Sequence, residues 1–507
     1  MTAATTSTER KLGAGTKLLY ALGATATSLK GRALSTFLLI FYNQVVGLPP
    51  KFVGMILMVA IIVDAVVDPL VGQISDNFKS RWGRRHPFMI AAALPYPLAF
   101  FLLWNPPTDW SDPMLLGWLA TLLIGVRILD TFFELPHQAL APELAYEYDS
   151  RTRLMALRHF FTVIGGLGMQ VMAYQVFLRE NPDGSGGVLA RDGYFLYSLV
   201  GALIIFATMT ISTLGTLNQV PHLRQAPARK VSFRVMVREV IETLSNRTFL
   251  VITGAAMFIS IAVGVRNGLE LYIGLYFWNL TQPQLATLAT VSVIGGFLGT
   301  ALAPFIASRL GKKIGLIAVF GTAVLVHVTP VSLRLLGLAP PNGTPELLAL
   351  IYGEEIFNST LAAATGVILA SLVADVVEDA EVKTGRRSEG LLLSATALMR
   401  KVVSSAGPFI ATLVLTLIAF PVGAERKEVA PEVLHSLGLA YVPTILGLYG
   451  VAIAALFAFN ISRQTHEENL RKLREAAALA ETVSITDDPE GPIPPVPVPT
   501  PAPSRPS

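Results

Sequence analysis

The sequence has no cysteine among its 507 residues. Disulfides, thiol catalysis and thiolate metal sites are therefore excluded. Charge is also scarce, because 15% of the residues are charged and 52% are hydrophobic, whereas soluble globular chains carry about 25% charged residues. A nucleotide-binding glycine-rich loop, an H-E-x-x-H motif and a G-x-S-x-G motif are all missing. Neither an ATPase nor a common intramembrane hydrolase is indicated.

Apolar runs long enough to cross a bilayer recur along most of the chain. A crossing takes about 20 residues, and a soluble protein of this length would instead need several domains joined by linkers. We therefore predict an all-α polytopic membrane protein with 12 transmembrane helices in two six-helix halves. The predicted spans are Ala24–Val46, Val53–Gly72, Pro87–Trp104, Met114–Leu135, Leu154–Phe177, Tyr194–Leu217, Phe249–Trp278, Leu285–Ala307, Ile314–Leu335, Leu347–Leu372, Gly390–Phe420 and Leu437–Phe459.

Polar stretches divide the chain into four parts. We expect an N-terminal six-helix half at 1–217, a basic cytoplasmic linker at 218–247, a C-terminal half at 248–461 and a tail at 462–507. The tail should begin as a charged helix and end in an extended, disordered proline-rich segment. The first apolar run is too long for a signal-peptide core, so we interpret it as an uncleaved first helix.

Basic residues gather in loops on one predicted side of the membrane. They produce the net charge of +4 and the pI near 9.1, which would otherwise suggest nucleic-acid binding. Lys79 and Arg151 follow the second and fourth spans, and Lys383 and Arg386 follow the tenth. The positive-inside rule then puts both termini in the cytoplasm. We expect a bacterial inner membrane protein.

An internal repeat supports two related halves. The run Arg81-Trp82-Gly83-Arg84-Arg85 after the second span is echoed by Arg309-Leu310-Gly311-Lys312-Lys313 after the eighth. A basic loop alone is an ordinary solvated feature, but its recurrence in register favours a duplicated transporter fold with the substrate site between the halves. We expect both runs to form gating loops, through Arg81, Gly83, Arg84, Arg309 and Gly311.

Two carboxylates lie inside the second span, where an ionisable residue costs about 2.5–3.5 kcal/mol on insertion scales. Asp64 and Asp68 are four residues apart and therefore share one helical face. They repel each other unless a cation or a proton sits between them. The alternative is a structural salt bridge to another span.

The fourth span adds further oxygens. Arg127 and Asp130 are spaced to pair with each other, and Thr131 and Glu134 follow on the same helix. Oxygen-only ligation suits a hard cation such as Na⁺ and equally suits a proton. Helix-end capping near Pro136 is the alternative explanation for Glu134.

Cationic residues inside other spans balance these acids: Lys30, Arg32, Arg158, Arg266 and Lys401. A cavity with so many cations would suit a carboxylate, sulfate or phosphate on the substrate. Glu270, Glu354 and Glu355 are alternative, internal partners. The rings of Tyr272, Tyr276, Phe277 and Trp278 suit either stacking on a sugar or an aromatic belt at the membrane interface.

Several of these segments fall in a familiar order. Asp64-Ala65-x-x-Asp68-Pro69, Arg81-Trp82-Gly83 and Glu134-Leu135-Pro136 are followed by Arg158-x-Phe160-Phe161 and Ala374-Asp375-Val376-Val377-Glu378 with Lys401. In this order and spacing the sequence resembles the glycoside–pentoside–hexuronide:cation symporters of the major facilitator superfamily, the group of melibiose permease. The resemblance spans nearly all the predicted helices but not the tail.

The resemblance implies roles for individual residues. It assigns Asp64, Asp68, Thr131 and Glu134 to the cation site, and Arg158 and Lys401 to a polar network that links this site to substrate. Three positions depart from the family pattern. Val67 replaces an amide of the sodium-using members, which favours H⁺. Ser28 and Gln138 replace a sugar-binding aspartate and a stacking tryptophan, which leaves room for an anionic glycoside or a lysolipid-like substrate.

The function that we expect is cation-coupled symport of a sugar, glycoside or glycoside-like solute by alternating access, with Na⁺ or H⁺ as the coupling ion. We expect Ser28, Lys30, Arg32, Gln138, Arg158 and Lys401 to bind the substrate. The expected partners are a small solute, the coupling cation and the lipid bilayer, for a monomer without cofactor, enzymatic activity or nucleic-acid binding. A sensor that kept the fold and a proton-driven exporter are the alternatives.

Overall fold

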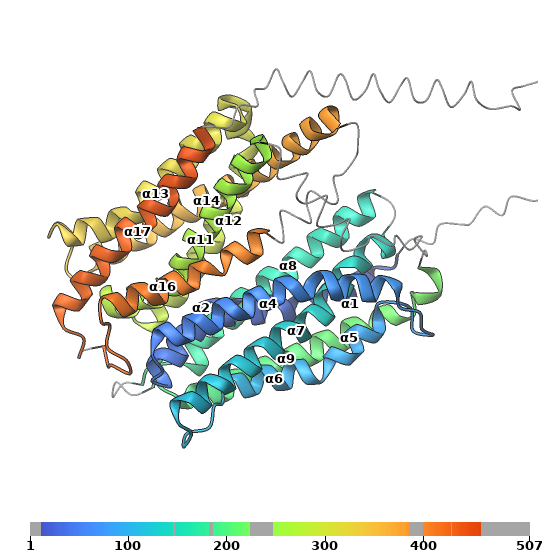
Figure 1. The fold of residues 1–507 in the computed structure, drawn as a ribbon, viewed down its shortest axis with the longest axis horizontal. Helices are drawn as coiled ribbons and strands as arrows, with labels where there is room; N and C mark the ends of the chain where they lie inside the picture. Colours follow the sequence, from blue (N-terminus) through green and yellow to red (C-terminus); the bar gives the residue numbers. More distant parts are fainter. Residues whose placement is uncertain are drawn as a thin grey trace, which may run out of the picture.

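The computed structural model describes residues 12–145, 148–181, 186–223, 247–384, 399–426 and 428–457. Most of the predicted linker and the whole predicted tail lie outside these ranges, as do Arg386 and Arg387. Within them the chain is helical and forms two bundles, drawn from blue to green and from green to red in Figure 1.

The N-terminal bundle contains α1 (Ala14–Leu22), α2 (Ala24–Thr36), α3 (Leu38–Ile40), η1 (Phe41–Val45), α4 (Pro50–Asn77), α5 (His86–Ala93), α6 (Pro95–Leu103), α7 (Asp112–Leu144), α8 (Tyr148–Met172), η2 (Ala173–Phe177), α9 (Asp192–Leu217) and η3 (Val220–His222). The C-terminal bundle contains α11 (Arg247–Tyr272), η4 (Ile273–Phe277), α12 (Gln282–Leu310), α13 (Lys312–Leu335), α14 (Pro345–Thr384), α16 (Ala406–Leu417) and α17 (Pro431–Phe457).

Among the described residues, 10 helical segments are long and apolar enough to cross a membrane. They confirm all the predicted spans except the first and the eleventh. The first is helical but is interrupted at Gly23 and Phe37, and it begins at Ala14 rather than at the predicted Ala24. Only the second part of the eleventh span is described, as helix at 399–404 followed by α16.

The two bundles repeat local features at matching positions. Gly83, between the second and third spans, has a φ of 78°, and Gly311, between the eighth and ninth, has a φ of 76°. This left-handed backbone favours glycine because a Cβ atom would be strained there. The first and seventh spans also both end in a π-helical turn, η1 and η4. These pairs agree with the internal repeat that the sequence predicts.

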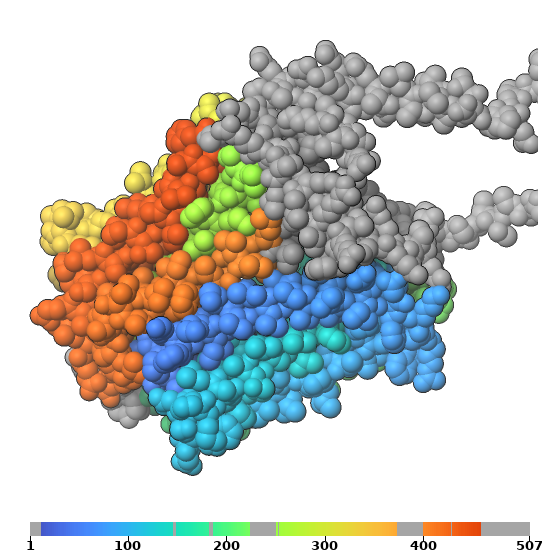
Figure 2. Space-filling model, in the orientation of Figure 1, coloured from blue at the N-terminus to red at the C-terminus, as the bar shows by residue number. Residues whose placement is uncertain are grey.

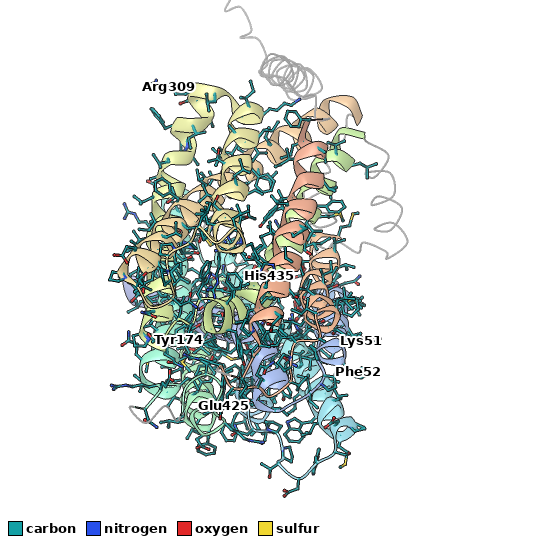
Figure 3. All side chains as sticks on the ribbon, turned by 90° about the vertical axis from the view of Figure 1, so that its left-hand side faces the viewer. Lys51, Phe52, Tyr174, Arg309, Glu425 and His435 are labelled. Atoms are coloured by element: carbon teal, nitrogen blue, oxygen red, sulfur yellow. The ribbon has the colours of Figure 1, made fainter. Side chains whose placement is uncertain are left out.

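The bundles meet at one end, which we call the closed end and which carries loops 46–49, 278–281 and 418–430. There the Tyr272 hydroxyl donates to Asn43 Oδ1 at 2.7 Å, and the Gln44 amide donates to the Pro421 carbonyl oxygen at 3.0 Å. Toward the opposite end the ribbons of the two bundles diverge (Figure 1). We call that opposite end, which carries Arg309, the basic end. Figure 3 shows Arg309 far from Glu425 of the closed end.

Aromatic rings fill this contact between the bundles. Tyr272 and Tyr276 pack edge-on against Phe420 at ring-centroid distances of 5.3 and 5.1 Å. Tyr272, Tyr276, Phe277 and Trp278 are all buried. Of the two alternatives for these rings, the aromatic belt does not fit, since a belt faces lipid headgroups and these rings are buried.

α16 crosses α4 along the same contact, as Figure 2 shows where orange lies against blue. Gly54 allows this close approach, because a Cβ atom there would lie 1.9 Å from Thr412 Oγ1. In the C-terminal bundle, Gly295 and Gly299 are four residues apart on α12 and face α14. A Cβ on Gly299 would lie 1.9 Å from the Thr360 carbonyl oxygen. This is the small-residue spacing that lets membrane helices approach.

We predict that Gly299→Ala lowers the melting temperature of the purified protein in detergent, because a methyl group would force α12 away from a rigid backbone oxygen. Overpacking of this kind costs about 1–3 kcal/mol. Gly296→Ala is the matched control, since a Cβ on Gly296 has no atom within 4 Å. Thermal denaturation followed by size-exclusion chromatography measures both. Equal melting temperatures of the two variants would refute this account of the α12–α14 contact.

Candidate functional site

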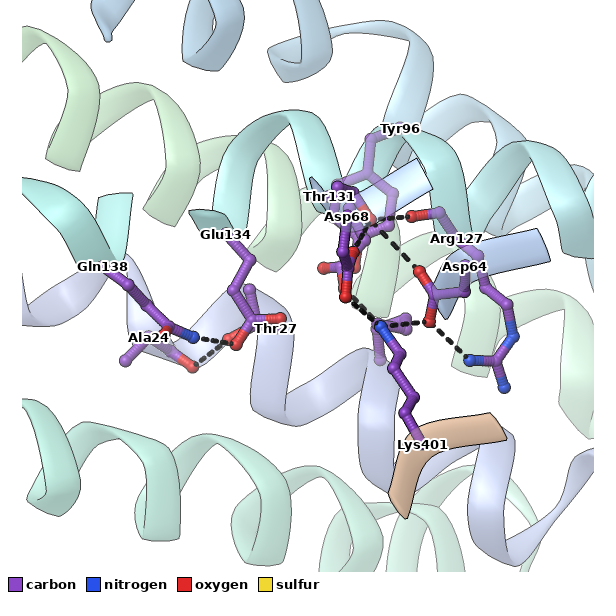
Figure 4. Close-up of polar contacts among 12 residues, drawn as sticks. Ala24, Thr27, Asp64, Asp68, Tyr96, Arg127, Thr131, Glu134, Gln138 and Lys401 are labelled. Atoms are coloured by element: carbon purple, nitrogen blue, oxygen red, sulfur yellow. Dashed lines mark hydrogen bonds and ion pairs between the residues drawn. The ribbon is translucent and has the colours of Figure 1, made fainter. Parts of the chain in front are cut away.

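Asp64 and Asp68 point from α4 toward one ammonium group. Lys401 lies in the helical residues before α16, and its Nζ is 2.9 Å from Asp64 Oδ2 and also bonds Asp68 Oδ2 (Figure 4). The spacing of four residues thus brings both carboxylates to one face, as predicted. The contact joins the two bundles, because α4 belongs to one and Lys401 to the other.

Arg127 and Thr131 of α7 complete this cluster. Arg127 Nη1 donates to Asp64 Oδ2 at 3.1 Å. The Thr131 hydroxyl lies 3.1 Å from Asp64 Oδ1 and 2.9 Å from Asp68 Oδ1. A hydroxyl has one hydrogen, so Thr131 donates to one carboxylate at a time and offers its lone pairs elsewhere. Two carboxylates face two cationic groups here, and their charges balance.

The predicted pairing of Arg127 with Asp130 is wrong. Asp130 instead accepts from Lys30 Nζ of α2 at 2.5 Å and from the Tyr96 hydroxyl of α6 at 2.9 Å. Lys30 and Asp130 are both nearly buried, at 8% and 5% exposure. Arg127 and Asp130 are close enough along α7 to pair, but each has a partner on a neighbouring helix that satisfies it more fully.

Glu134 lies apart from the two aspartates. Its Oε1 accepts from Gln138 Nε2 at 2.7 Å and is 4.0 Å from Arg158 Nη2 (Figure 4). Of the four residues expected at the cation site, the structure brings Asp64, Asp68 and Thr131 together and places Glu134 one helical turn further along α7.

Glu134 instead faces a cavity of about 350 Å³. Ligand pockets typically have about 300–1,000 Å³. The cavity at Glu134 is lined by Thr27, Ser28, Glu134, Gln138, Met155, Arg158, His159 and Thr162. Three residues expected to bind the substrate, Ser28, Gln138 and Arg158, therefore lie in one place. The structure adds Thr27, Met155, His159 and Thr162, which sequence reasoning missed. Met155 and Thr162 lie three and four residues from Arg158, and this spacing was the available signal, because it marks one face of α8.

The other expected site residues lie elsewhere. Lys30 is held by Asp130, Lys401 is held by Asp64 and Asp68, and Arg32 is exposed on α2 one turn beyond Ser28. In the predicted gating loops, Arg84 Nη2 pairs with Glu143 of α7 at 2.7 Å. The Arg81 and Arg309 guanidinium groups lie over aromatic rings, at 5.0 Å from Trp82 and 4.9 Å from Phe305.

Comparison with known proteins decides the family. The family model described as MFS/sugar transport protein matches residues 19–463. The chain belongs to this family. It is therefore an integral membrane transporter rather than an enzyme, and its family uses coupling ions in place of cofactors. The resemblance to glycoside symporters and the major facilitator fold are both confirmed.

Two relatives and one solved structure illustrate the match. A putative glycoside/cation symporter of Escherichia coli (strain K12) is 24% identical over 472 residues, which cover 92% of this chain and 96% of that protein. The isoprimeverose transporter of Lactiplantibacillus pentosus is 23% identical over 457 residues, which cover 88% of each. The crystal structure of a bacterial homologue to the human lysosomal transporter Spinster superposes with a TM-score of 0.62 at 14% identity, over 90% of this chain and 97% of that one.

We predict that Lys30→Met strongly destabilises this transporter, because it leaves the Asp130 carboxylate buried without its ammonium partner. Breaking a buried pair from one side costs about 3–5 kcal/mol. The double variant Lys30→Met/Asp130→Asn should recover most of the lost stability, since Asn carries no charge and still accepts from Tyr96. Melting temperatures in detergent measure both. A double variant no more stable than Lys30→Met would contradict the pairing.

Proposed function

We propose that this protein is a cation-coupled symporter, which moves a glycoside or a related hydroxyl-bearing solute by alternating access. The observation that carries the proposal is the ammonium of Lys401, which bridges Asp64 and Asp68 from the opposite bundle. A coupling ion needs a site whose occupancy changes how the two halves contact each other. This contact has that property, because each side supplies one member of an ion pair.

The coupling cation and Lys401 compete for the same two carboxylates. With Lys401 in place, two carboxylates face the ammonium and the Arg127 guanidinium, so the cluster is neutral. When Lys401 withdraws, one monovalent cation or one proton restores this balance. Binding of the cation therefore favours the state in which the halves have separated at this point, and a ligand shifts such an equilibrium by its differential affinity for the two states.

Oxygen ligands are available for that cation from Asp64, Asp68 and Thr131, and hard cations prefer oxygen. This chain has Val67 where the sodium-using members that it resembles carry an amide side chain. The loss of that oxygen ligand favours H⁺ as the coupling ion. Glu134 is one turn away in the cavity, where it can connect occupancy of the ion site to the substrate.

The substrate class follows from the cavity lining. Ser28, Gln138 and Glu134 supply donors and acceptors for hydroxyl groups, and Arg158 supplies a charge that suits a carboxylate on the solute. The names of two relatives, a putative glycoside/cation symporter and an isoprimeverose transporter, support the same class. Both neutral glycosides and anionic ones such as glucuronides therefore belong in the first screen.

The proposed setting is a bacterial inner membrane, with a monomer whose two termini are cytoplasmic. The basic residues of the loops then face the cytoplasm. In that orientation the closed end faces outward and the structure corresponds to an inward-facing state. The cavity lies toward the basic end, since Gln138 is little more than one turn before Glu143, the partner of Arg84.

The direct test is uptake of a solute library into membrane vesicles, with Na⁺ and H⁺ gradients imposed separately. We expect one solute to accumulate under one of the two gradients, because symport links solute and ion in the same direction. Vesicles without the protein are the control. Extrusion under an inward proton gradient would favour an exporter, and the absence of any gradient-driven movement of neutral or acidic glycosides would contradict the proposal.

We predict that Asp68→Asn abolishes gradient-driven accumulation while the protein remains folded and still exchanges solute across the membrane. Asn lacks one of the two carboxylate charges for which Lys401 and the coupling cation compete. Coupling free energies are typically about 1–3 kcal/mol, or about 5- to 150-fold, so the loss of coupling should remove solute accumulation of that order. Asp109→Asn is the control, because Asp109 is exposed in the loop between α6 and α7. If the Asp68→Asn variant still accumulates solute fully, Asp68 is not part of the cation site.

A further inference from the structure

A second cluster of titratable side chains lies inside the C-terminal bundle, away from the proposed cation site. Its centre is His327 of α13. His327 Nδ1 is 3.0 Å from Glu354 Oε1 of α14, and Nε2 is 2.7 Å from the Tyr441 hydroxyl of α17. Asn358, one turn after Glu354, places its amide nitrogen 3.1 Å from the same Nδ1. The mechanism proposed above uses none of these groups.

These contacts determine where the hydrogens lie. An amide nitrogen only donates, so the Asn358 contact makes His327 Nδ1 an acceptor that carries no hydrogen. Glu354 Oε1 faces the same lone pair, and two acceptors 3.0 Å apart repel unless one of them is protonated. The repulsion is relieved when Glu354 is a carboxylic acid that donates to Nδ1, while the Asn358 amide is shared between Nδ1 and the Glu354 carboxyl group. His327 is then neutral, and its Nε2 hydrogen is donated to the Tyr441 oxygen.

The surrounding charges lead to the same assignment. On α11, Arg266 Nη2 pairs with Glu355 Oε2 of α14 at 2.9 Å, and Glu270 lies one turn after Arg266. Arg32 of α2 attracts Glu270 from the other bundle. With all acids ionised, Glu270, Glu354 and Glu355 carry three negative charges against two guanidinium groups. One proton on Glu354 makes the cluster neutral, and an uncompensated charge at this depth in a membrane is expensive.

We propose that Glu354 and His327 form a proton-binding site of the C-terminal half, separate from the cation site at Asp64 and Asp68. The bound state holds the proton on Glu354. On release, the Glu354 carboxylate accepts from a hydrogen on Nδ1 and from the Asn358 amide, which no longer donates to Nδ1. Nε2 loses its hydrogen and accepts from Tyr441. One proton leaves, and no other group changes its charge. The site does not depend on which cation the N-terminal half takes, so a proton moved here is additional to that cation.

Infrared difference spectroscopy of the purified protein tests the site, with H⁺ itself as the probe. Wild-type protein should show the C=O band of a buried carboxylic acid at neutral pH, and this band should disappear as the pH is raised. Glu354→Gln should lack the band and should bind one proton fewer per molecule in a potentiometric titration. His327→Gln retains Glu354 but changes its acceptor, so the band should remain and move in frequency.

Two controls separate this site from others. Glu346→Gln removes an exposed glutamate at the start of α14 and should leave the neutral-pH band unchanged. Asp68→Asn should also leave the neutral-pH band unchanged, even though this substitution abolishes coupling at the N-terminal site. A neutral-pH band that persists unaltered in both Glu354→Gln and His327→Gln would assign the proton to another acid, such as Glu270, and overturn the proposal. Absence of the band from the wild type would do the same.

Discussion

A charge that leaves water must find an opposite charge, and this constraint organises the interior of the transporter. The ammonium of Lys401 satisfies it by lying between Asp64 and Asp68, two carboxylates that would otherwise repel each other on one face of α4. Because Lys401 and the aspartates belong to different bundles, the constraint acts between the halves. Moving the bundles apart at this point exposes three charges, so another cation has to take the place of Lys401.

Other buried charges are paired within a single bundle, where the two partners do not move relative to each other. Lys30 and Asp130 join α2 to α7 within one bundle, and Arg266 and Glu355 join α11 to α14 within the other. These pairs do not cross between the halves, so the rocking of one half against the other leaves them intact. Ion pairs inside a bundle fix its internal geometry, whereas an ion pair between bundles, such as that of Lys401 with Asp64 and Asp68, responds to the conformational state. This difference identifies Lys401, rather than Lys30, as the cation that takes part in switching.

Sequence patterns predicted the parts of the structure that depend on local spacing. Hydropathy located ten spans, and the spacing of four residues placed Asp64 and Asp68 on one face. The same reasoning failed for Arg127 and Asp130, because spacing along one helix says nothing about partners on other helices. His327 was overlooked for a related reason: Glu354 and Tyr441, its partners, are 27 and 114 residues away along the chain. Such contacts depend on how α13, α14 and α17 pack together.

The two contacts between the halves differ in kind, and this difference bears on how the transporter switches. At the closed end, Tyr272, Asn43 and Gln44 form neutral hydrogen bonds between the bundles. One partly exposed ion pair, Arg426 Nη1 with Glu180 Oε2 at 3.5 Å, also joins the bundles there. Water replaces neutral hydrogen bonds at a net cost of about 0.5–1.5 kcal/mol each, and solvent-exposed ion pairs contribute only about 0–1 kcal/mol. Opening this end therefore requires little beyond the exposure of apolar rings. The contact at Lys401 differs because Asp64 is only 6% exposed, so the withdrawal of Lys401 leaves a buried carboxylate that needs another cation. The closed end can therefore open when the halves rock, whereas the contact of Lys401 with Asp64 and Asp68 determines which cations permit that motion.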